Sequence, residues 1–369
     1  MLSHASAFRP GSVASASMTT IPPTMTAYQL VEWGEPARYN EVPVPEPGPG
    51  EVLLKVAGVG LCHSDIMFLD APPGAIPYPL PYTLGHETAG WVEACGAGVD
   101  DLAEGQALAV VGVPSCGACH WCVRGHDNYC QRGQMGRGYG EDGGLAQYLV
   151  VSRRELVPLR TLDPRRVGPI TDAGVTSYHA VKKALPKLEP GTTALVIGAG
   201  GLGGYAVQYL RLLTQAQVIA VDTAQHRLDF AQELGAHHTL LSTGDNAADL
   251  VAQIRELSGG EGCAGVFDFV GDGGTMAMAL QCARILGTVG IVGAGGGRTY
   301  VGWGALPLEC DLFVPMAGSI SDLQEVVAIA ESGALRIEVE LFPFEQAPEA
   351  YERLRHGTLR SRAVVTPNG

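Results

Sequence analysis

One continuous stretch, from Thr193 to Asp222, restricts the fold of this chain more strictly than any other. It reads TALVIGAGGLGGYAVQYLRLLTQAQVIAVD, so two short apolar runs flank a glycine-rich turn and a helical segment. Apolar residues recur at helical spacing within that segment, at Leu202, Ala206, Leu210 and Leu213. The order strand, turn, helix, strand predicts parallel strands joined by a right-handed crossover, as in a doubly wound sheet.

The turn carries the glycine pattern of a dinucleotide-binding site. Gly198, Gly200 and Gly203 form G-x-G-x-x-G between the predicted strand and the predicted helix. Gly198 permits the tight turn, Gly200 lets a pyrophosphate approach the backbone, and Gly203 lets the helix pack closely on the strand. Gly201 and Leu202 lie at the start of the helix, where free N–H groups are expected to face the phosphates.

Asp222, at the end of the second strand, indicates which cofactor the site takes. Its carboxylate is expected to accept hydrogen bonds from the ribose hydroxyls of adenosine and to repel a 2′-phosphate. The sequence therefore predicts NAD(H) rather than NADP. Arg227 weakens this preference slightly, because a neighbouring arginine accommodates such a phosphate in some proteins. The plainer alternative is that the glycines only turn the chain.

The chain differs in character on either side of this stretch. From Ala27 to about Val150, β-type runs such as EVLLKVAGVG alternate with Gly/Pro-rich segments, which favours a β-rich region with long loops. From about Gly318 the tail is expected to form a helix, a strand, a second helix and a last strand. A chain of 369 residues is too long for one core. We therefore expect an α/β protein with a β-rich domain of residues 27–178 and 318–369 and a cofactor domain of residues 179–317.

The first 26 residues are rich in Ser, Ala, Thr and Pro and show no hydrophobic periodicity. They are expected to form a disordered arm, without the apolar core of a secretory signal or the arginines of a transit peptide. The cytoplasm is the expected compartment. No apolar run approaches the roughly 20 residues that cross a bilayer. A net charge of −14 argues against nucleic acid or an anionic membrane as a partner.

The nine cysteines are odd in number and too scattered for a secreted disulfide scaffold. Four of them gather in CGACHWCVRGHDNYC, at Cys116, Cys119, Cys122 and Cys130. Four close thiolates suit a structural zinc site with no open coordination position. Iron–sulfur ligation usually shows other spacings, and a redox pair would meet competing thiols. Small core residues are expected at the other apolar positions, Cys95, Cys263, Cys282 and Cys310.

Further motifs stand out around the four cysteines, namely GLCHSD, GHETAGWVEACGAGV and TDAGVTSYHAV. Together with the four-cysteine loop and VIGAGGLG, these motifs resemble the zinc-dependent medium-chain alcohol dehydrogenases from about Ala27 to Thr366. The resemblance implies a GroES-like catalytic domain beside a Rossmann domain, with the active site in the cleft between them. It also implies an NAD-dependent oxidoreductase with two zinc ions, one catalytic and one structural.

By this resemblance, Cys62, His86 and a residue of TDAGVT hold the catalytic zinc. Many relatives have cysteine at that third position, and this chain has Asp172, a competent ligand. Asp65 would orient the ligand histidine, and Glu87 would be the acidic residue behind the metal. Two plainer interpretations remain: Asp172 as the N-cap of the following helix, and Glu87 as half of a buried ion pair.

The resemblance also assigns residues around the reacting groups. Zinc would act as a Lewis acid on the substrate oxygen, and Ser64 would carry its proton outward. Several relatives have a histidine for the last proton transfer where this chain has Met67, so the proton would leave through His63, cofactor hydroxyls or water. The residues that the resemblance places near the cofactor are His63, Thr176, Val270, Val292 and Arg362.

An apolar substrate pocket is expected from Met67, Phe68, Tyr78, Trp303 and Met316. Such a pocket favours a medium-sized hydrophobic secondary alcohol or ketone over a polyol, although tryptophan and methionine are often simple core residues.

Relatives associate through the sheet edge of the cofactor domain, so a homo-oligomer is expected, a tetramer rather than a dimer. Two other functions stay open on this fold. A zinc-free reductase of activated double bonds has no use for Cys62, His86 and the four cysteines together. A nucleotide-binding protein without turnover would be expected to lack zinc ligands or Ser64, and all of these are present.

Overall fold

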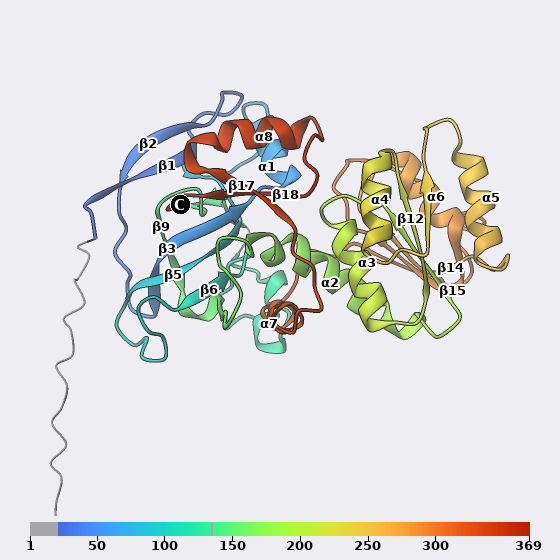
Figure 1. The fold of residues 1–369 in the computed structure, drawn as a ribbon, viewed down its shortest axis with the longest axis horizontal. Helices are drawn as coiled ribbons and strands as arrows, with labels where there is room; N and C mark the ends of the chain where they lie inside the picture. The colour runs from blue at the N-terminus through green and yellow to red at the C-terminus, as the bar shows by residue number, and fades with distance from the viewer. Residues whose placement is uncertain (1–20, 134–135) are drawn as a thin grey trace, which may run out of the picture.

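The computed structural model describes residues 21–133 and 136–369 and shows two bodies side by side (Figure 1). One body is rich in strands and contains the first described residues and the C-terminus, and the other is a parallel sheet covered by helices. The prediction of an α/β chain with a β-rich part and a doubly wound part is confirmed. Within the described residues, no helix has the length and apolar character that a membrane crossing requires.

A seven-stranded sheet forms the centre of the β-rich body in the described part of the chain. β3 (Glu51–Gly60) lies within it and pairs antiparallel with β5 (Glu87–Cys95), β9 (Tyr148–Ser152) and β18 (Arg362–Thr366). The valines and leucines of β3 are buried throughout, because side chains cover both faces of this strand. The remaining strands of the sheet are β6 (Ala107–Val110), β10 (Leu156–Pro158) and β17 (Val339–Pro343). The tail of the chain therefore completes a sheet that the N-terminal half begins.

Smaller elements close the ends of this body. A three-stranded sheet contains β1 (Thr24–Leu30), β2 (Arg38–Pro43) and β4 (Tyr82–Thr83), and a strand pair contains β7 (Gly136–Arg137) and β8 (Gly140–Glu141). Helices α1 (His63–Leu69) and α8 (Ala347–Arg355) pack against each other. The short 3₁₀ turns are η1 (Cys122–Arg124), η2 (Asp127–Tyr129), η3 (Arg153–Glu155), η4 (Gly168–Thr171), η5 (Leu185–Lys187) and η6 (Phe344–Gln346).

Two sequence predictions need correction in this body. The disordered arm expected over residues 1–26 is wrong at its end, because residues 24–26 already pair with β2. Residues 1–20 of that arm lie outside the described residues. Cys95 was expected in the core, but it ends β5 and is exposed, whereas Cys263, Cys282 and Cys310 are buried as predicted.

The second body contains a six-stranded parallel sheet, in the order β13-β12-β11-β14-β15-β16 among the described residues. Its strands are β11 (Thr193–Ile197), β12 (Gln217–Asp222), β13 (His238–Leu241), β14 (Cys263–Asp268), β15 (Ala283–Ile291) and β16 (Asp311–Phe313). Its helices are α3 (Gly203–Leu213), α4 (Gln225–Glu233), α5 (Ala247–Leu257) and α6 (Gly273–Cys282). The strand order reverses at β11, which pairs with β12 on one side and β14 on the other. Ligands of doubly wound sheets bind outside the strand ends at such a reversal.

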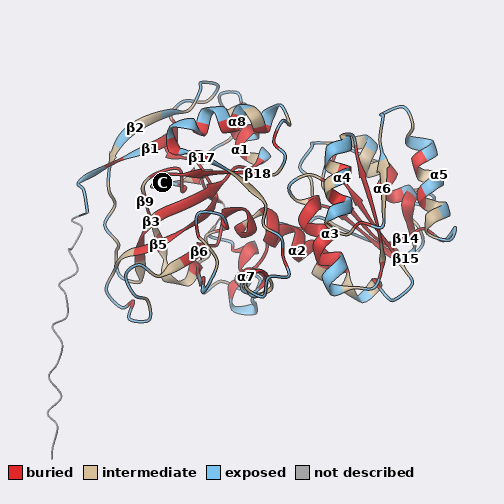
Figure 2. Cartoon of the chain, viewed as in Figure 1, coloured by how far each residue is buried: buried red, intermediate tan, exposed pale blue. Residues whose placement is uncertain are grey.

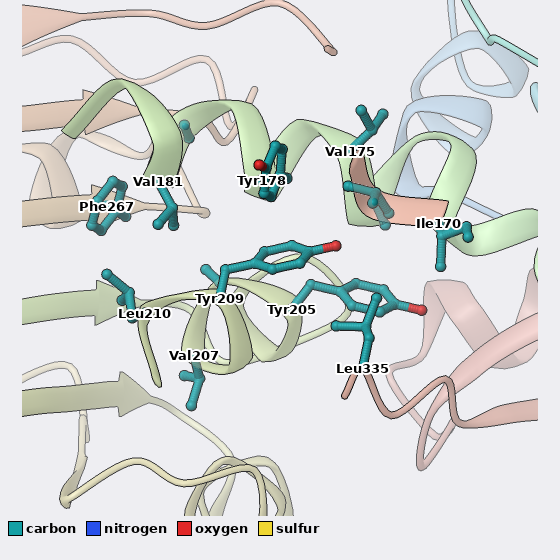
Figure 3. Close-up of a cluster of buried hydrophobic side chains, with 14 of the residues drawn as sticks. Ile170, Val175, Tyr178, Val181, Tyr205, Val207, Tyr209, Leu210, Phe267 and Leu335 are labelled. Carbon is teal, nitrogen blue, oxygen red and sulfur yellow. The ribbon is translucent and has the colours of Figure 1, made fainter. Parts of the chain in front are cut away.

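Helix α2 (Ala173–Ala184) joins the two bodies, because it packs on α3 (Figure 3). Tyr178 of α2 meets Tyr209 of α3 edge-on, with ring centroids 5.2 Å apart. Buried residues run through this junction as well as through both sheets (Figure 2). Of the apolar stripe predicted for α3, Ala206 and Leu210 are buried, whereas Leu213 in its last turn is exposed. Helix α7 (Ile320–Glu331) also packs against α2.

Candidate active site

A cavity of about 860 Å³ lies where the two bodies meet. On one side it is lined by the glycine turn after β11 and by residues at the carboxyl ends of β12, β14 and β15. On the other side it is lined by the start of α1, the residue before β5 and the start of α2. The catalytic and cofactor residues predicted from the sequence all line it, namely His63, Ser64, Thr176, Gly198, Gly200, Gly201, Leu202, Gly203, Asp222, Arg227, Val270, Val292 and Arg362.

Four potential metal ligands converge at the wall of this cavity. The donor atoms of Cys62, His86, Glu87 and Asp172 all lie within 4.8 Å of one another. They come from segments far apart in the sequence: Cys62 precedes α1, His86 and Glu87 stand at the start of β5, and Asp172 precedes α2. The structure therefore brings together the three ligands and the acidic residue that the resemblance implied. One thiolate, one imidazole and one carboxylate make a donor set that zinc accepts.

Asp65 fixes the orientation of two of these groups. Its buried carboxylate accepts a hydrogen bond from the backbone N–H of Cys62 (3.0 Å) and one from Nδ1 of His86 (2.9 Å). Because Nδ1 donates to the carboxylate, Nε2 is the ring nitrogen that faces the other ligands, and it lies 3.5 Å from Oδ2 of Asp172. The contact agrees with the orienting role that the resemblance implied for Asp65.

Asp172 stands at the N-cap position of α2, yet its side chain accepts no hydrogen bond from the N–H groups of that helix. One carboxylate oxygen instead faces His86, and the other accepts a hydrogen bond from the hydroxyl of Thr176 (3.1 Å). The N-cap interpretation is therefore wrong for the side chain. This orientation of the Asp172 carboxylate suits a metal ligand. The Thr176 hydroxyl holds Oδ1, and Oδ2 is left to face the other ligands.

Glu87 is half of a buried ion pair, since Arg362 donates a hydrogen bond to its Oε1. Its Oε2 is buried without a hydrogen-bond partner among the described residues, which a nearby cation would relieve. Burial raises the pKa of Glu87 to about 7, while Arg362 acts in the opposite direction. Arg362 also lies against the glycine turn, because a Cβ at Gly201 would come within 2.7 Å of its Cδ. It therefore stands between the metal-ligand group and the turn.

The acidic side chains of the ligand group favour a bound cation. Burial opposes a charge on His86, yet Asp65 and Asp172 raise its pKa well above the usual range. Burial also opposes ionisation of Asp172, but the hydrogen bond with His86 lowers its pKa to about 2. Both directions favour a charged imidazole beside ionised Asp172, and a divalent metal would take the place of the imidazole proton.

The second ligand group belongs to residues 116–130, which we call the cysteine lobe. The sulfur atoms of Cys116, Cys119, Cys122 and Cys130 all lie within 4.8 Å of one another. Three of the Sγ–Sγ distances are 3.5, 3.9 and 4.0 Å, and the four cysteines are free thiols. Thiolates on one tetrahedral zinc stand about 3.8 Å apart. The lobe therefore fits a closed four-thiolate zinc site with no position for a substrate.

The glycine turn has the geometry that its sequence predicts. Gly198 has φ +87, which favours glycine, and a Cβ at Gly203 would come within 1.9 Å of the Gly198 carbonyl oxygen. A Cβ at Gly200 would meet no atom within 4 Å, so this side of the turn is open to a ligand. Asp222 lies across the turn, where its carboxylate accepts hydrogen bonds from the backbone N–H groups of Ala199 (2.8 Å) and Ala224 (2.9 Å). Arg227 lies 3.7 Å from the same carboxylate.

An aromatic wall faces the metal-ligand group. Phe68 stacks on Tyr139 with ring centroids 5.2 Å apart, and Tyr139 meets His86 edge-on at 5.5 Å. Met67, Phe68, Tyr78 and Met316 line the cavity as predicted. Trp303 was a wrong prediction, because it does not line the cavity and is 90% exposed. Tyr139 was missed, since it lies in a glycine-rich loop that has no periodic signal.

Comparison with known proteins identifies both parts of the chain. Residues 48–161 match the family described as alcohol dehydrogenase GroES-like domain, and residues 201–332 match the family described as zinc-binding dehydrogenase. The chain is 31% identical over 353 residues to an NAD-dependent alcohol dehydrogenase of Sulfurisphaera tokodaii, covering 93% of this chain and 100% of that protein.

Two solved structures are similar over almost the whole chain. The alcohol dehydrogenase of Aeropyrum pernix has a TM-score of 0.85 and 32% identity, covering 93% of this chain and 100% of its own. The acetophenone reductase of Geotrichum candidum, solved in complex with NAD, has a TM-score of 0.83 and 32% identity, covering 94% and 98%.

The hydrogen bond between Thr176 and Asp172 generates a prediction about metal affinity. Thr176→Val removes the hydroxyl that fixes the Asp172 carboxylate, so zinc at the Cys62 site is expected to dissociate about 10- to 100-fold more readily. Thr176→Ser keeps the hydroxyl and serves as the matched control. Chelator competition followed by zinc analysis measures the difference. Equal zinc retention by the two variants would show that the hydroxyl plays no part in holding the ligand.

Proposed function

The chain belongs to the zinc-containing medium-chain alcohol dehydrogenase family, and from this premise we propose how its residues interconvert alcohols and carbonyl compounds with NAD. One observation carries the proposal: the metal-ligand group of Cys62, His86 and Asp172 shares a single cavity with the glycine turn and Asp222. A substrate held at the ligand group and a cofactor held at the turn would therefore meet in that cavity. The proposed domain division, residues 27–178 with 318–369 and residues 179–317, places this cavity between the domains.

The ligand residues divide between two zinc ions with different tasks. Cys62, His86 and Asp172 would hold the catalytic ion, with Glu87 behind it, and the four thiolates of the cysteine lobe would hold the structural one. Bound zinc supplies a Lewis acid, and NAD supplies a hydride acceptor. Asp222 supports NAD rather than NADP, since its buried carboxylate stands at the turn where a 2′-phosphate would have to fit.

Ser64 is the residue best placed to move the substrate proton. Its Oγ lies 3.4 Å from Nε2 of His86 and lines the cavity, so it can accept the hydroxyl proton of a bound alcohol. The serine passes its own proton on at the same time, because its hydroxyl carries only one. His63 follows Cys62 in the chain, is exposed and lines the same cavity, which makes it the proposed exit toward solvent. Met67, where several relatives have histidine, cannot take part.

The substrate is proposed to be a medium-sized hydrophobic secondary alcohol or the corresponding ketone. Phe68, Tyr78 and Tyr139 present aromatic rings beside the ligand group, and Met67 and Met316 add flexible apolar side chains. A polyol would leave several hydroxyl groups without partners against such a wall. The similarity to a protein named acetophenone reductase supports the same class of substrate.

A cytoplasmic homotetramer is proposed as the state of assembly. β16 stands at the edge of the six-stranded sheet, and apolar side chains are exposed on and beside it, namely Leu286, Leu308, Leu312 and Val314. Such a surface suits pairing with a second copy of the chain. The nine free thiols suit a reducing compartment.

The proposed activity is tested by NAD-linked oxidation of 1-phenylethanol. Wild type is expected to reduce NAD in preference to NADP, and Ser64→Ala to lower kcat by about 10²- to 10⁴-fold without loss of zinc. Ser258→Ala, at the end of α5, is the control and is expected to behave as wild type. If the protein reduced activated double bonds and did not oxidise alcohols, it would be a zinc-free reductase and the proposal would be wrong. Activity confined to sugar alcohols would contradict the proposed substrate, and NADH binding without turnover would contradict an enzyme.

The proposed assembly is tested at the edge of the six-stranded sheet. Val314→Lys is expected to lower the mass of the particle in sedimentation experiments, because it introduces a charge beside β16, where the side chain is 74% exposed. Leu341→Lys introduces the same charge on β17, at the edge of the other sheet, and serves as the control. A wild-type monomer, or equal effects of both variants, would contradict association through β16.

A further inference from the structure

One wall of the substrate cavity is held by the cysteine lobe. Pro315, Met316 and Ala317 line the cavity just before α7 begins. The side-chain amide of Asn128 donates a hydrogen bond to the carbonyl oxygen of Met316 (2.8 Å). The carboxylate of Asp127 accepts one from the backbone N–H of Ile320 (2.6 Å). The lobe therefore forms a hydrogen bond with each end of the segment 316–320, which we call the pocket wall.

The two side chains that make these contacts are buried, so they favour one position of the wall. Asp127 is 6% exposed and Asn128 is 5% exposed. A buried amide or carboxylate that loses a hydrogen bond is destabilised, so both groups favour the position of the wall that keeps these bonds. Both residues lie within three positions of Cys130, a predicted ligand of the structural zinc. Closure of the four-thiolate site would therefore fix their position.

The backbone of the wall is strained between these two hydrogen bonds. Ala317 has φ +47, a left-handed conformation that residues other than glycine rarely adopt. On its far side Gly318 lies against α2, since a Cβ there would come within 2.4 Å of Cγ2 of Val175. The pocket wall therefore lies between the lobe and α2. Without its hydrogen bonds to the lobe, its backbone would be expected to leave the strained conformation at Ala317.

The lobe is anchored to the β-rich body through Ser115, the residue just before it. The backbone N–H of Ser115 donates to Oε1 of Glu155 (2.8 Å), and Nε of Arg154 donates to the hydroxyl of Ser115 (3.0 Å). Glu155 is 3% exposed and pairs with Arg137. The lobe thus connects the β-rich body to the pocket wall through hydrogen bonds on both sides.

We infer that Asp127 and Asn128 are positioning residues that set the width of the substrate cavity, and that the cysteine lobe thereby governs which alcohols are accepted. The inference rests on the proposed function, because it concerns the same cavity. Neither residue touches the reacting groups, so the lobe would act on the fit of bulky substrates and leave the chemical step alone. A lobe that only stabilises the fold would instead lower activity on all alcohols alike.

The test compares Asn128→Ala with Arg124→Ala. Arg124 belongs to the same lobe and is exposed, and among the described residues its side chain bonds only to His120 of the lobe, so its variant is the matched control. For Asn128→Ala, KM for 1-phenylethanol is expected to change about tenfold, while KM for 2-propanol and both kcat values stay within about twofold of wild type. Zinc content should remain that of wild type. Equal changes for the two alcohols, or none for either, would overturn the inference.

A second measurement does not depend on activity. Hydrogen exchange of the peptide that spans residues 315–320 is expected to be at least about tenfold faster in Asn128→Ala than in Arg124→Ala or wild type. Asp127→Asn keeps the shape of the side chain and should give a smaller change in the same direction. Unchanged exchange would overturn the inference even if alcohols are not oxidised. Wild type that oxidises neither alcohol would instead overturn the proposed function.

Discussion

The buried carboxylate of Asp65 is the interaction on which the active site depends. It binds the backbone of Cys62 and the ring of His86 at the same time, so it joins two segments that supply metal ligands. A buried charge costs several kcal/mol unless hydrogen bonds compensate it, and both of its oxygens have such partners here. The thiol and the imidazole are therefore oriented before any metal binds. Asp172, held by Thr176, completes the group from a third direction.

Helix α2 ties this group to the cofactor site. Asp172 precedes its first turn, and Ser177 in the next turn donates a hydrogen bond to the carbonyl of Leu202 in the glycine turn (2.8 Å). Further along, Tyr178 packs edge-on against Tyr209 of α3. Hydride transfer requires reacting atoms within about 3–3.5 Å of each other. A single packed helix between the ligand group and the cofactor turn gives the chain a rigid way to set that distance.

Much of this arrangement could be predicted from the sequence, because its signals are local. The strands of the parallel sheet, the glycine turn and the four cysteines each occupy one short stretch with its own periodicity or spacing. Contacts between distant segments carry no such signal. The stacking of Tyr139 on Phe68 joins a glycine-rich loop to α1, and the hold of Asn128 on Met316 joins residues 188 positions apart. The prediction for Trp303 was wrong for the same reason. Its apolar ring suggested a pocket residue, but the sequence does not show that its loop lies outside the cavity.

The central claim is that Cys62, His86 and Asp172 form a metal site separate from the cysteine lobe. Zinc analysis of wild type and Asp172→Ala, on the same preparations that are assayed for alcohol oxidation, tests it most directly. The account predicts two zinc ions per chain in wild type, one for each ligand group, and one in the inactive variant. One zinc ion in wild type together with an active Asp172→Ala protein would mean that only the cysteine lobe binds metal. The proposed zinc chemistry at Cys62, His86 and Asp172 would then be wrong.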